Sequence, residues 1–279
     1  MVTIKDLNFA FKKNEPLFTD LSLNMKTGRT YGLFGLNGAG KTTLLNHISG
    51  MLFPEKGECL VLDQPSRNRH PDVLKEIFLL PEQFDLPSMT AETFTKLHAP
   101  FYPDFSHEQL QKILNEFDIN QQKKLPELSY GQRKKFLIAF ALSSQAKLLL
   151  MDEPTNGLDI PSKSQFRKIM AASDLSDRCV VISTHQVRDL NTLIDHLTVL
   201  NNGKIIFQQS IQEIFDNLGF EKISHDDTRT VLFAEETFGG KAAILPKNES
   251  KKETEIDLEL LFSGIIQETD AINNQFKTD

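Results

Sequence analysis

The chain has 279 residues, of which 39% are hydrophobic and 25% are charged, and its formal net charge is −7 at pH 7. A globular protein with a buried core is expected, and the acidic balance argues against a nucleic-acid partner, which would favour a basic face. There is no charged-then-apolar leader and no apolar run approaching the roughly 18 residues of a membrane span, so we expect a chain that does not itself cross a membrane.

Short apolar runs alternate with helix-like stretches from the N-terminus to about residue 215. This alternation predicts an α/β fold with a largely parallel sheet. The two cysteines, Cys59 and Cys179, lie in the strand-like runs "ECLVL" and "CVVIS". We expect them to be buried thiols in a reducing compartment rather than a disulfide.

A glycine-rich segment follows one of the first apolar runs. In "GLFGLNGAGKTTLL", Gly35, Gly40, Lys41 and Thr42 occupy the fixed positions of G-x-x-x-x-G-K-[ST], between a predicted strand and a predicted helix. Glycines let such a loop turn its amides toward a β-phosphate, and the lysine neutralises β- and γ-phosphate oxygens. The threonine hydroxyl is offered to Mg²⁺, and Thr43 reaches a phosphate. The sequence therefore predicts a nucleoside triphosphate site.

The stretch from Phe84 to Leu128 interrupts the alternation with phenylalanine, proline and polar residues. We interpret residues 84–145 as a helical insert. One helix in it is predicted to begin with a capping box made by Ser106 and Gln109. Its apolar residues follow at helical spacing: Leu110, Ile113, Leu114 and Phe117.

A second helix of the insert is predicted to start within "ELSYGQRKK", where Ser129 and Gln132 form another capping box. Apolar residues follow it at roughly helical spacing: Phe136, Leu137, Phe140 and Ala141. The free amides and the positive dipole end of such a terminus make it a site for an anion. The sequence alone leaves the identity of that anion open.

Two later apolar strands end in polar residues. "KLLLMDE" ends in Asp152 and Glu153, and "CVVISTHQ" carries His185 at its end. Because buried strands of such sheets present their carboxyl ends to ligands, we expect Asp152 to hold the Mg²⁺ shell and Glu153 to act as general base. His185 is predicted to contact the γ-phosphate and to hold the attacking water and Glu153 in line.

After residue 220 the chain changes character. We predict two short strands ("TVLFA" and "KAAIL") around a Gly239-Gly240 turn, a polar link over residues 246–255 and a helix. The apolar face of that helix is Leu258, Leu261, Phe262 and Ile265. We expect residues 1–220 to form a folded nucleotide-binding domain and residues 221–279 a small appended extension.

These motifs, in this order, resemble those of the nucleotide-binding subunits of ATP-binding-cassette (ABC) transporters, over about residues 1–215. "GLNGAGKTT" resembles the Walker A motif, "LSYGQ" the signature, "LLLMDE" the Walker B motif, "NGLD" the D-loop and "STHQ" the switch histidine. The resemblance implies a P-loop NTPase with a mostly parallel central sheet, an N-terminal antiparallel β subdomain, a helical insert carrying the signature and a small α+β C-terminal extension. It implies that ATP is held by the residues Gly35, Asn37, Gly38, Ala39, Gly40, Lys41, Thr42 and Thr43.

The resemblance also answers the question of the anion. In this family the signature helix grips the γ-phosphate of ATP held by a partner subunit, which implies that Ser129, Gly131 and Gln132 bind ATP held by a second chain. It implies that Phe11 stacks on adenine. Two positions depart from the family: Glu82 stands where a metal-sensing glutamine is expected, with Gln83 beside it, and Tyr130 replaces the first glycine of the signature. Glu82 is therefore a candidate metal ligand, and we expect the signature to work because Gly131 is retained.

The function implied is an ATPase subunit that dimerises, as a homodimer, around two ATP and drives a separately encoded membrane permease. It would lie on the cytoplasmic face of the cell membrane through that permease. The "FYPDF" segment and the signature-to-D-loop sequence look most like ABC-2 exporters. Two alternatives stay open: a soluble mechanochemical ABC ATPase, and a nucleotide-gated scaffold without turnover. The long insertion or second cassette of the soluble ATPases that act on DNA or ribosomes is absent from this sequence.

Overall fold

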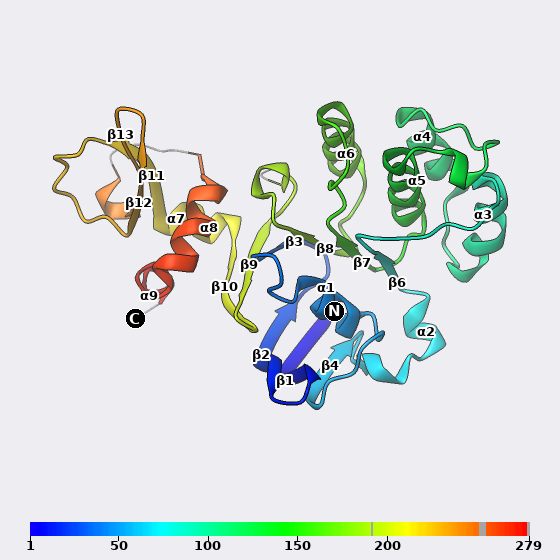
Figure 1. Ribbon diagram of the computed structural model, residues 1–279, viewed down its shortest axis with the longest axis horizontal. Coiled ribbons are helices and arrows are strands. Elements are labelled where there is room, and N and C mark those ends of the chain that lie inside the picture. The colour runs from blue at the N-terminus through cyan, green and yellow to red at the C-terminus, as the bar shows by residue number, and fades with distance from the viewer. Residues whose placement is uncertain (191, 251–254, 278–279) are drawn as a thin grey trace.

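A six-stranded sheet forms the centre of the chain in a computed structural model that describes residues 1–190, 192–250 and 255–277 (Figure 1). Its order is β10-β9-β3-β8-β7-β6. The strands are β3 (Arg29–Phe34), β6 (Ile77–Leu80), β7 (Leu148–Asp152), β8 (Cys179–Thr184), β9 (His196–Asn201) and β10 (Lys204–Ser210). Neighbours are parallel except β9 and β10. The predicted largely parallel sheet is confirmed.

The predicted N-terminal antiparallel sheet is also present, in the order β2-β1-β4-β5. Its strands are β1 (Val2–Lys12), β2 (Glu15–Met25), β4 (Lys56–Val61) and β5 (Gln64–Pro65). Helix α1 (Lys41–Ile48) contacts both β4 and β7, and its Leu44, Leu45 and Ile48 have no solvent exposure. Burying one such side chain contributes roughly 1.5–3 kcal/mol, so this cluster holds the start of α1 firmly between the two sheets.

Both cysteines are buried free thiols in that cluster, as predicted. Burial raises the pKa of Cys59 to about 11 and that of Cys179 to about 12. Neither thiol is therefore ionised near neutral pH.

The helical insert lies at one end of the molecule (Figure 1). The helices between β5 and β8 are α2 (Pro71–Leu74), α3 (Ala91–His98), α4 (His107–Glu116), α5 (Tyr130–Ser143) and α6 (Ile160–Ala172). The capping box of α5 is complete: Ser129 Oγ accepts from Gln132 N (3.2 Å), and Gln132 Oε1 accepts from Ser129 N (3.0 Å). At α4, Ser106 caps as predicted, but Gln109 does not reciprocate, because its side-chain oxygen accepts a hydrogen bond from Gln145 Nε2.

The C-terminal extension lies at the opposite end (Figure 1). It follows α7 (Ile211–Asn217) and comprises β11 (Leu218–Ile223), β12 (Phe233–Thr237), β13 (Gly240–Pro246), α8 (Leu258–Gln267) and α9 (Thr269–Asn273). The second predicted strand and the helix agree with β13 and α8. The first strand starts only at Phe233, and residues 251–254 of the predicted polar link lie outside the described residues.

Strand β11 was not expected from the sequence, and it crosses residue 220, where the domain boundary was predicted. Its apolar pattern is weak because it contains Glu221, which is largely buried and pairs with Arg229 at 3.0 Å. The boundary at residue 220 stays a prediction that none of these observations tests.

The extension packs directly on the central sheet. The Phe262 ring of α8 meets Phe34 at the end of β3 edge to face, with ring centroids 6.2 Å apart. Asn273 Nδ2 donates to Ile206 O in β10 (2.9 Å). The extension and the sheet therefore share one continuous hydrophobic core. None of the helices within the described residues is long and apolar enough to cross a membrane.

Candidate nucleotide site

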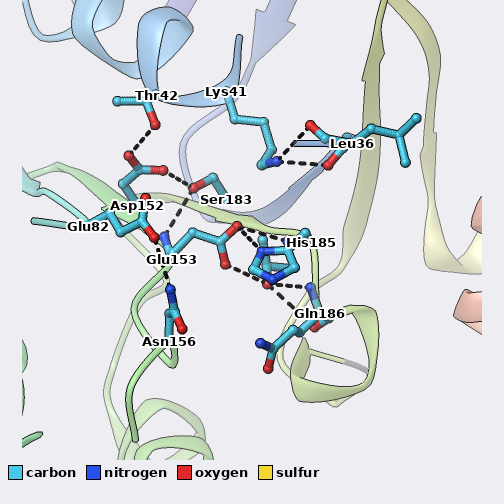
Figure 2. A network of polar contacts seen from close by, with 12 residues as sticks. Leu36, Lys41, Thr42, Glu82, Asp152, Glu153, Asn156, Ser183, His185 and Gln186 are labelled. Carbon is cyan, nitrogen blue, oxygen red and sulfur yellow. Dashed lines mark hydrogen bonds and ion pairs between the residues drawn. The ribbon is translucent and has the colours of Figure 1, made fainter. Parts of the chain in front are cut away.

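The loop between β3 and α1 folds around the ammonium group of Lys41, the first residue of α1. Lys41 Nζ donates to Gly35 O (2.8 Å) and to Leu36 O (3.3 Å) (Figure 2). Gly38 and Gly40 have φ of 79° and 103°, in the left-handed region where a side chain would be strained. The loop thus joins a lysine, a helix N-terminus and backbone amides at one point, which is the arrangement that binds phosphate groups.

Asp152, the last residue of β7, receives hydrogen bonds on both carboxylate oxygens. Thr42 Oγ1 donates to Oδ2 (2.6 Å), and Ser183 Oγ donates to Oδ1 (Figure 2). Asp152 and Ser183 are register partners in the parallel pair β7 and β8. Because Asp152 is only 2% exposed, these two hydroxyls fix its direction toward the start of α1.

Glu153 and His185 form a close pair at the ends of the same two strands. His185 Nδ1 lies 2.7 Å from Glu153 Oε1, and the His185 backbone N–H donates to the same oxygen (3.0 Å). Thr184 Oγ1 donates to Oε2 (3.2 Å). The carboxylate is thus fixed by three groups of one segment. Glu153 itself has φ of 46°, a left-handed conformation that is uncommon for residues other than glycine.

Glu82 closes the site from the loop after β6. Its Oε1 accepts a hydrogen bond from Asn156 Nδ2 (2.9 Å), and its backbone carbonyl accepts one from Tyr130 Oη (2.9 Å). The Tyr130 ring stacks on Phe84 at 5.3 Å between centroids. A Cβ on Gly157 would lie 2.8 Å from the Tyr130 ring. The Tyr130 side chain, which comes from α5, therefore lies between the Glu82 loop and the "NGLD" segment.

Many of these groups line one cavity of about 740 Å³. Its lining residues are Phe11, Leu17, Asn37, Gly38, Gly40, Lys41, Thr42, Thr43, Glu82, Asp152, Glu153, Asn156 and His185. Of the residues predicted to bind nucleotide or metal, Gly35, Ala39, Ser129, Gly131 and Gln132 are not part of this lining. Gly35 and Ala39 nevertheless belong to the loop around Lys41, whereas the other three lie at the N-terminus of α5.

Phe11, near the end of β1, lies at the rim of the cavity. It is 67% exposed, and its ring meets Phe9 edge to face at 4.9 Å. An exposed aromatic face beside a phosphate-binding loop has the place and chemistry needed to stack on a base.

The cavity carries more negative than positive charge. Burial lowers the pKa of Lys41, while the carboxylates of Glu153, Asp152 and Glu82 act in the opposite direction. One ammonium group faces three carboxylates, so a triphosphate entering this cavity requires additional positive charge.

The residues present fit Mg²⁺ as the source of that charge. The Thr42 hydroxyl and the Asp152 carboxylate lie next to each other and offer oxygen ligands, and Glu82 offers another carboxylate to the same cavity. No cluster of three or more His, Cys, Asp or Glu side chains suited to a metal occurs in the described part of the chain. Mg²⁺ needs no such cage, since it is usually bound by one or two protein groups together with substrate phosphates and water.

The helix terminus of α5 has the features of an anion site, but its residues do not belong to this cavity's lining. Ser129 is exposed, and Gly131 presents no side chain, with Gly157 O 3.7 Å from where its Cβ would be. The Gln132 side chain is used in the cap.

Several residues at or beside the site were not predicted as site residues from the sequence. Ser183 and Asn156 begin the "STHQ" and "NGLD" motifs, but nothing in the sequence indicated that they bond Asp152 and Glu82. Lys134, whose Nζ donates to the backbone carbonyl of Glu153 (2.7 Å), did have a signal. It lies three, four and seven residues before Leu137, Ile138 and Ala141, which are all buried. The basic run around it concealed that it belongs to the buried face of α5.

Residues 18–156 match the family model described as ABC transporter. An energy-coupling factor transporter ATP-binding protein of Ligilactobacillus salivarius is 30% identical over 282 residues, covering 93% of this chain and 96% of the relative. The ABC transporter ATP-binding protein YtrB of Bacillus subtilis is 27% identical over 216 residues, covering 77% and 73%. The methionine import ATP-binding protein MetN of Carboxydothermus hydrogenoformans is 28% identical over 251 residues, covering 84% and 73%.

Solved structures share the fold. An ATP-binding subunit of an ABC transporter aligns with a TM-score of 0.69 at 24% identity, covering 77% of this chain and 91% of the other. A dimeric ATP-binding cassette in a post-hydrolysis state, bound to ADP and Pi, aligns with a TM-score of 0.65 at 24% identity, covering 75% and 98%. The predicted fold class is confirmed by these likenesses.

Proposed function

This chain belongs to the ABC transporter family and is an ATPase of that family, and on that premise we propose that it is the subunit whose ATP hydrolysis drives a separate membrane permease. The observation that carries the proposal is the meeting of Lys41, Thr42, Asp152, Glu153 and His185 in one cavity. These residues come from α1 and from the ends of β7 and β8, far apart in the sequence. Their chemistry matches the parts of a phosphoryl-transfer site.

Each residue has a role in the proposed reaction. Lys41 and the loop amides hold the β- and γ-phosphates. Thr42 and Asp152, with Glu82 nearby, would hold Mg²⁺, which when bound neutralises charge on the phosphate oxygens. Glu153 accepts the proton of the attacking water, and His185, 2.7 Å from that carboxylate, orients it and contacts the γ-phosphate.

The nucleotide itself would be held mainly by the loop. We assign ATP binding to Phe11 through adenine stacking and to the loop residues Gly35, Asn37, Gly38, Ala39, Gly40 and Thr43 through phosphate contacts. The exposed position of Phe11 and its place in the cavity lining support the stacking role.

A second copy would complete the site. The N-terminus of α5 offers Ser129, Gly131 and Gln132 to an anion, yet none of the three lines the cavity of their own chain. A homodimer in which each α5 terminus meets ATP on the partner chain accounts for both facts. The dimeric cassette among the structural neighbours supports such an arrangement.

The permease is proposed as a separate membrane protein, with the ATPase peripheral on its cytoplasmic side. The helical insert and the Glu82 loop form the proposed docking surface. We propose export as the direction, because of the "FYPDF" segment and the signature-to-D-loop sequence. One relative is named for import, so transport of substrate by inverted and right-side-out vesicles carrying the complex is the test of direction.

The proposed function is tested with Glu153→Gln. This change keeps the shape of the side chain but removes the basic carboxylate, so turnover should fall by about 10² to 10⁴ while ATP binding survives. ATP should then be trapped between two chains, and gel filtration should show a dimer with ATP and a monomer with ADP. Normal turnover of the variant would contradict the assignment of Glu153, and ATP binding without turnover by the unchanged protein would favour a nucleotide-gated scaffold.

The partner-chain contact is tested by adding Ser129→Arg to Glu153→Gln. The larger side chain should abolish the dimer while each monomer still binds ATP. Ser224→Arg, the same change at an exposed serine of the extension, is the matched control and should leave the dimer intact. Loss of ATP binding by the Ser129→Arg monomer would mean that α5 contacts the phosphate of its own chain, which would contradict the arrangement.

A further inference from the structure

Lys134 is a lysine without solvent exposure in the second turn of α5. Its Nζ donates to two backbone carbonyls outside that helix, Glu153 O (2.7 Å) and Asn156 O (2.9 Å). The first carbonyl belongs to the candidate general base, and the second to the residue that bonds Glu82. One ammonium group thus connects the signature helix with the segment that follows β7.

The carbonyl of Glu153 is an unusual place for such a contact. Glu153 is one of ten residues other than glycine with positive φ (46°) in the described part of the chain, and such a conformation persists only where the surroundings hold it. Its backbone N–H donates to Ser183 O (3.1 Å), and its carbonyl accepts from Lys134 Nζ (2.7 Å) and from the backbone N–H of Asn156 (3.1 Å). The peptide groups on both sides of the strained residue are therefore fixed, one by β8 and the other by Lys134 of α5 together with the turn that follows β7.

Burying the ammonium group of Lys134 costs free energy, so filling space in the core does not explain why a lysine stands at this position. Burial lowers the pKa of Lys134 to about 8, although the carboxylates of Glu82, Glu153 and Asp152 oppose this effect. The same face of α5 is filled by Ile138 and Ala141 without such a cost. An apolar side chain at position 134 would pack there, but both carbonyls would lose the ammonium donor, and Glu153 O would keep only the Asn156 N–H.

We propose that Lys134 is a positioning residue, which holds the main chain of Glu153 in its left-handed conformation and so directs the carboxylate toward His185 and the nucleotide cavity. Because Lys134 belongs to the signature helix, it also makes the position of the base depend on the position of α5. This inference rests on the proposed role of Glu153 as general base.

The test compares Lys134→Met, Glu153→Gln and the double variant in the full-length chain, by steady-state and single-turnover ATP hydrolysis. Methionine keeps the length of the side chain and removes the ammonium group. If Lys134 acts through Glu153, kcat should fall by about 10²-fold, as expected for a displaced catalytic group, while the KM for ATP changes by less than about threefold. In the Glu153→Gln background, Lys134→Met should cause no further loss.

The control is Lys135→Met, the same change at the next residue, whose Nζ donates to Gln165 Oε1 (3.0 Å) on α6. It should keep the kcat of the unchanged protein. Thermal unfolding of every variant separates loss of fold from loss of positioning. If Lys134→Met does not fold, Lys134→Gln, which retains polar donors, is carried through the same cycle.

Two results would overturn the inference: a kcat of Lys134→Met equal to that of the unchanged protein, or an equal loss in the presence and absence of the Glu153 carboxylate. The second would show that Lys134 acts independently of the base. A Glu153→Gln variant with normal turnover would instead contradict the proposed function, whatever Lys134→Met does, so the two failures are distinguishable.

Discussion

Replacing Leu261 by alanine tests whether the C-terminal extension is part of the ATPase core. Leu261 lies on α8 with no solvent exposure, in the same continuous core as Phe34 of β3 and Phe207 of β10. Its neighbour Phe262 touches Phe34, the residue directly before the phosphate-binding loop. Truncating Leu261 should therefore weaken the nucleotide-binding body as well as the extension.

The expected magnitude follows from burial. A fully buried leucine replaced by alanine costs about 2–5 kcal/mol, because transfer free energy is lost and a cavity remains. The whole protein is stabilised by only about 5–15 kcal/mol, so this is a large fraction. At about 2–4 °C per kcal/mol for a chain of this size, a loss of about 3 kcal/mol lowers the melting temperature by about 6–12 °C.

The assay follows thermal unfolding by circular dichroism and, in parallel, by binding of a fluorescent ATP analogue. Both signals should shift together in Leu261→Ala. Phe238→Ala, which truncates a fully exposed side chain of the same extension, is the control and should leave both signals in place. If unfolding separated into two transitions, and the one reported by ATP binding stayed unchanged, the reasoning from a shared core would be refuted.

Three further outcomes are expected. Lys41→Ala removes the ammonium group of the phosphate loop and should weaken ATP binding by about 10- to 100-fold, the effect of losing one or two charged hydrogen bonds. Titration with a fluorescent ATP analogue measures the affinity, and an unchanged affinity would contradict the assignment of the loop. Burial lowers the pKa of His47 in the folded chain, so as the pH falls the unfolded chain binds a proton at this residue before the folded chain does. The stability that His47 contributes is therefore complete above about pH 6.5, the pKa of an unperturbed histidine, and is lost as the pH falls toward the lowered pKa of the folded chain. Between pH 7.5 and 5.5, the unfolding free energy from urea titrations should accordingly depend less steeply on pH in His47→Gln than in the unchanged protein. An equal dependence in the two proteins would contradict this role of His47. Tyr130→Phe removes the hydrogen bond to Glu82 O and should lower the unfolding free energy by about 0.5–1.5 kcal/mol in urea titrations, whereas no change would mean that ring stacking alone holds that contact.

The sequence by itself predicted the architecture of the ATPase body because its signals are local. Alternating apolar runs predicted the parallel sheet, and the caps at Ser106 and Ser129 predicted the starts of α4 and α5. The spacing of glycines before Lys41 predicted the phosphate loop. Each of these features is set by a backbone conformation or a hydrogen bond within a few residues, so a short window of sequence is sufficient to specify it.

The tertiary structure alone decided contacts between segments that are distant along the chain. No local pattern indicated that Ser183 bonds Asp152, that Asn156 bonds Glu82, or that Phe262 packs beside the phosphate loop. Lys134 shows the difference most clearly. Its helical spacing placed it on the buried face of α5. A buried ammonium group, however, is tolerated only where hydrogen-bond acceptors surround it. Here the acceptors are two carbonyls 19 and 22 residues away, which reach Lys134 only when β7 and α5 come together.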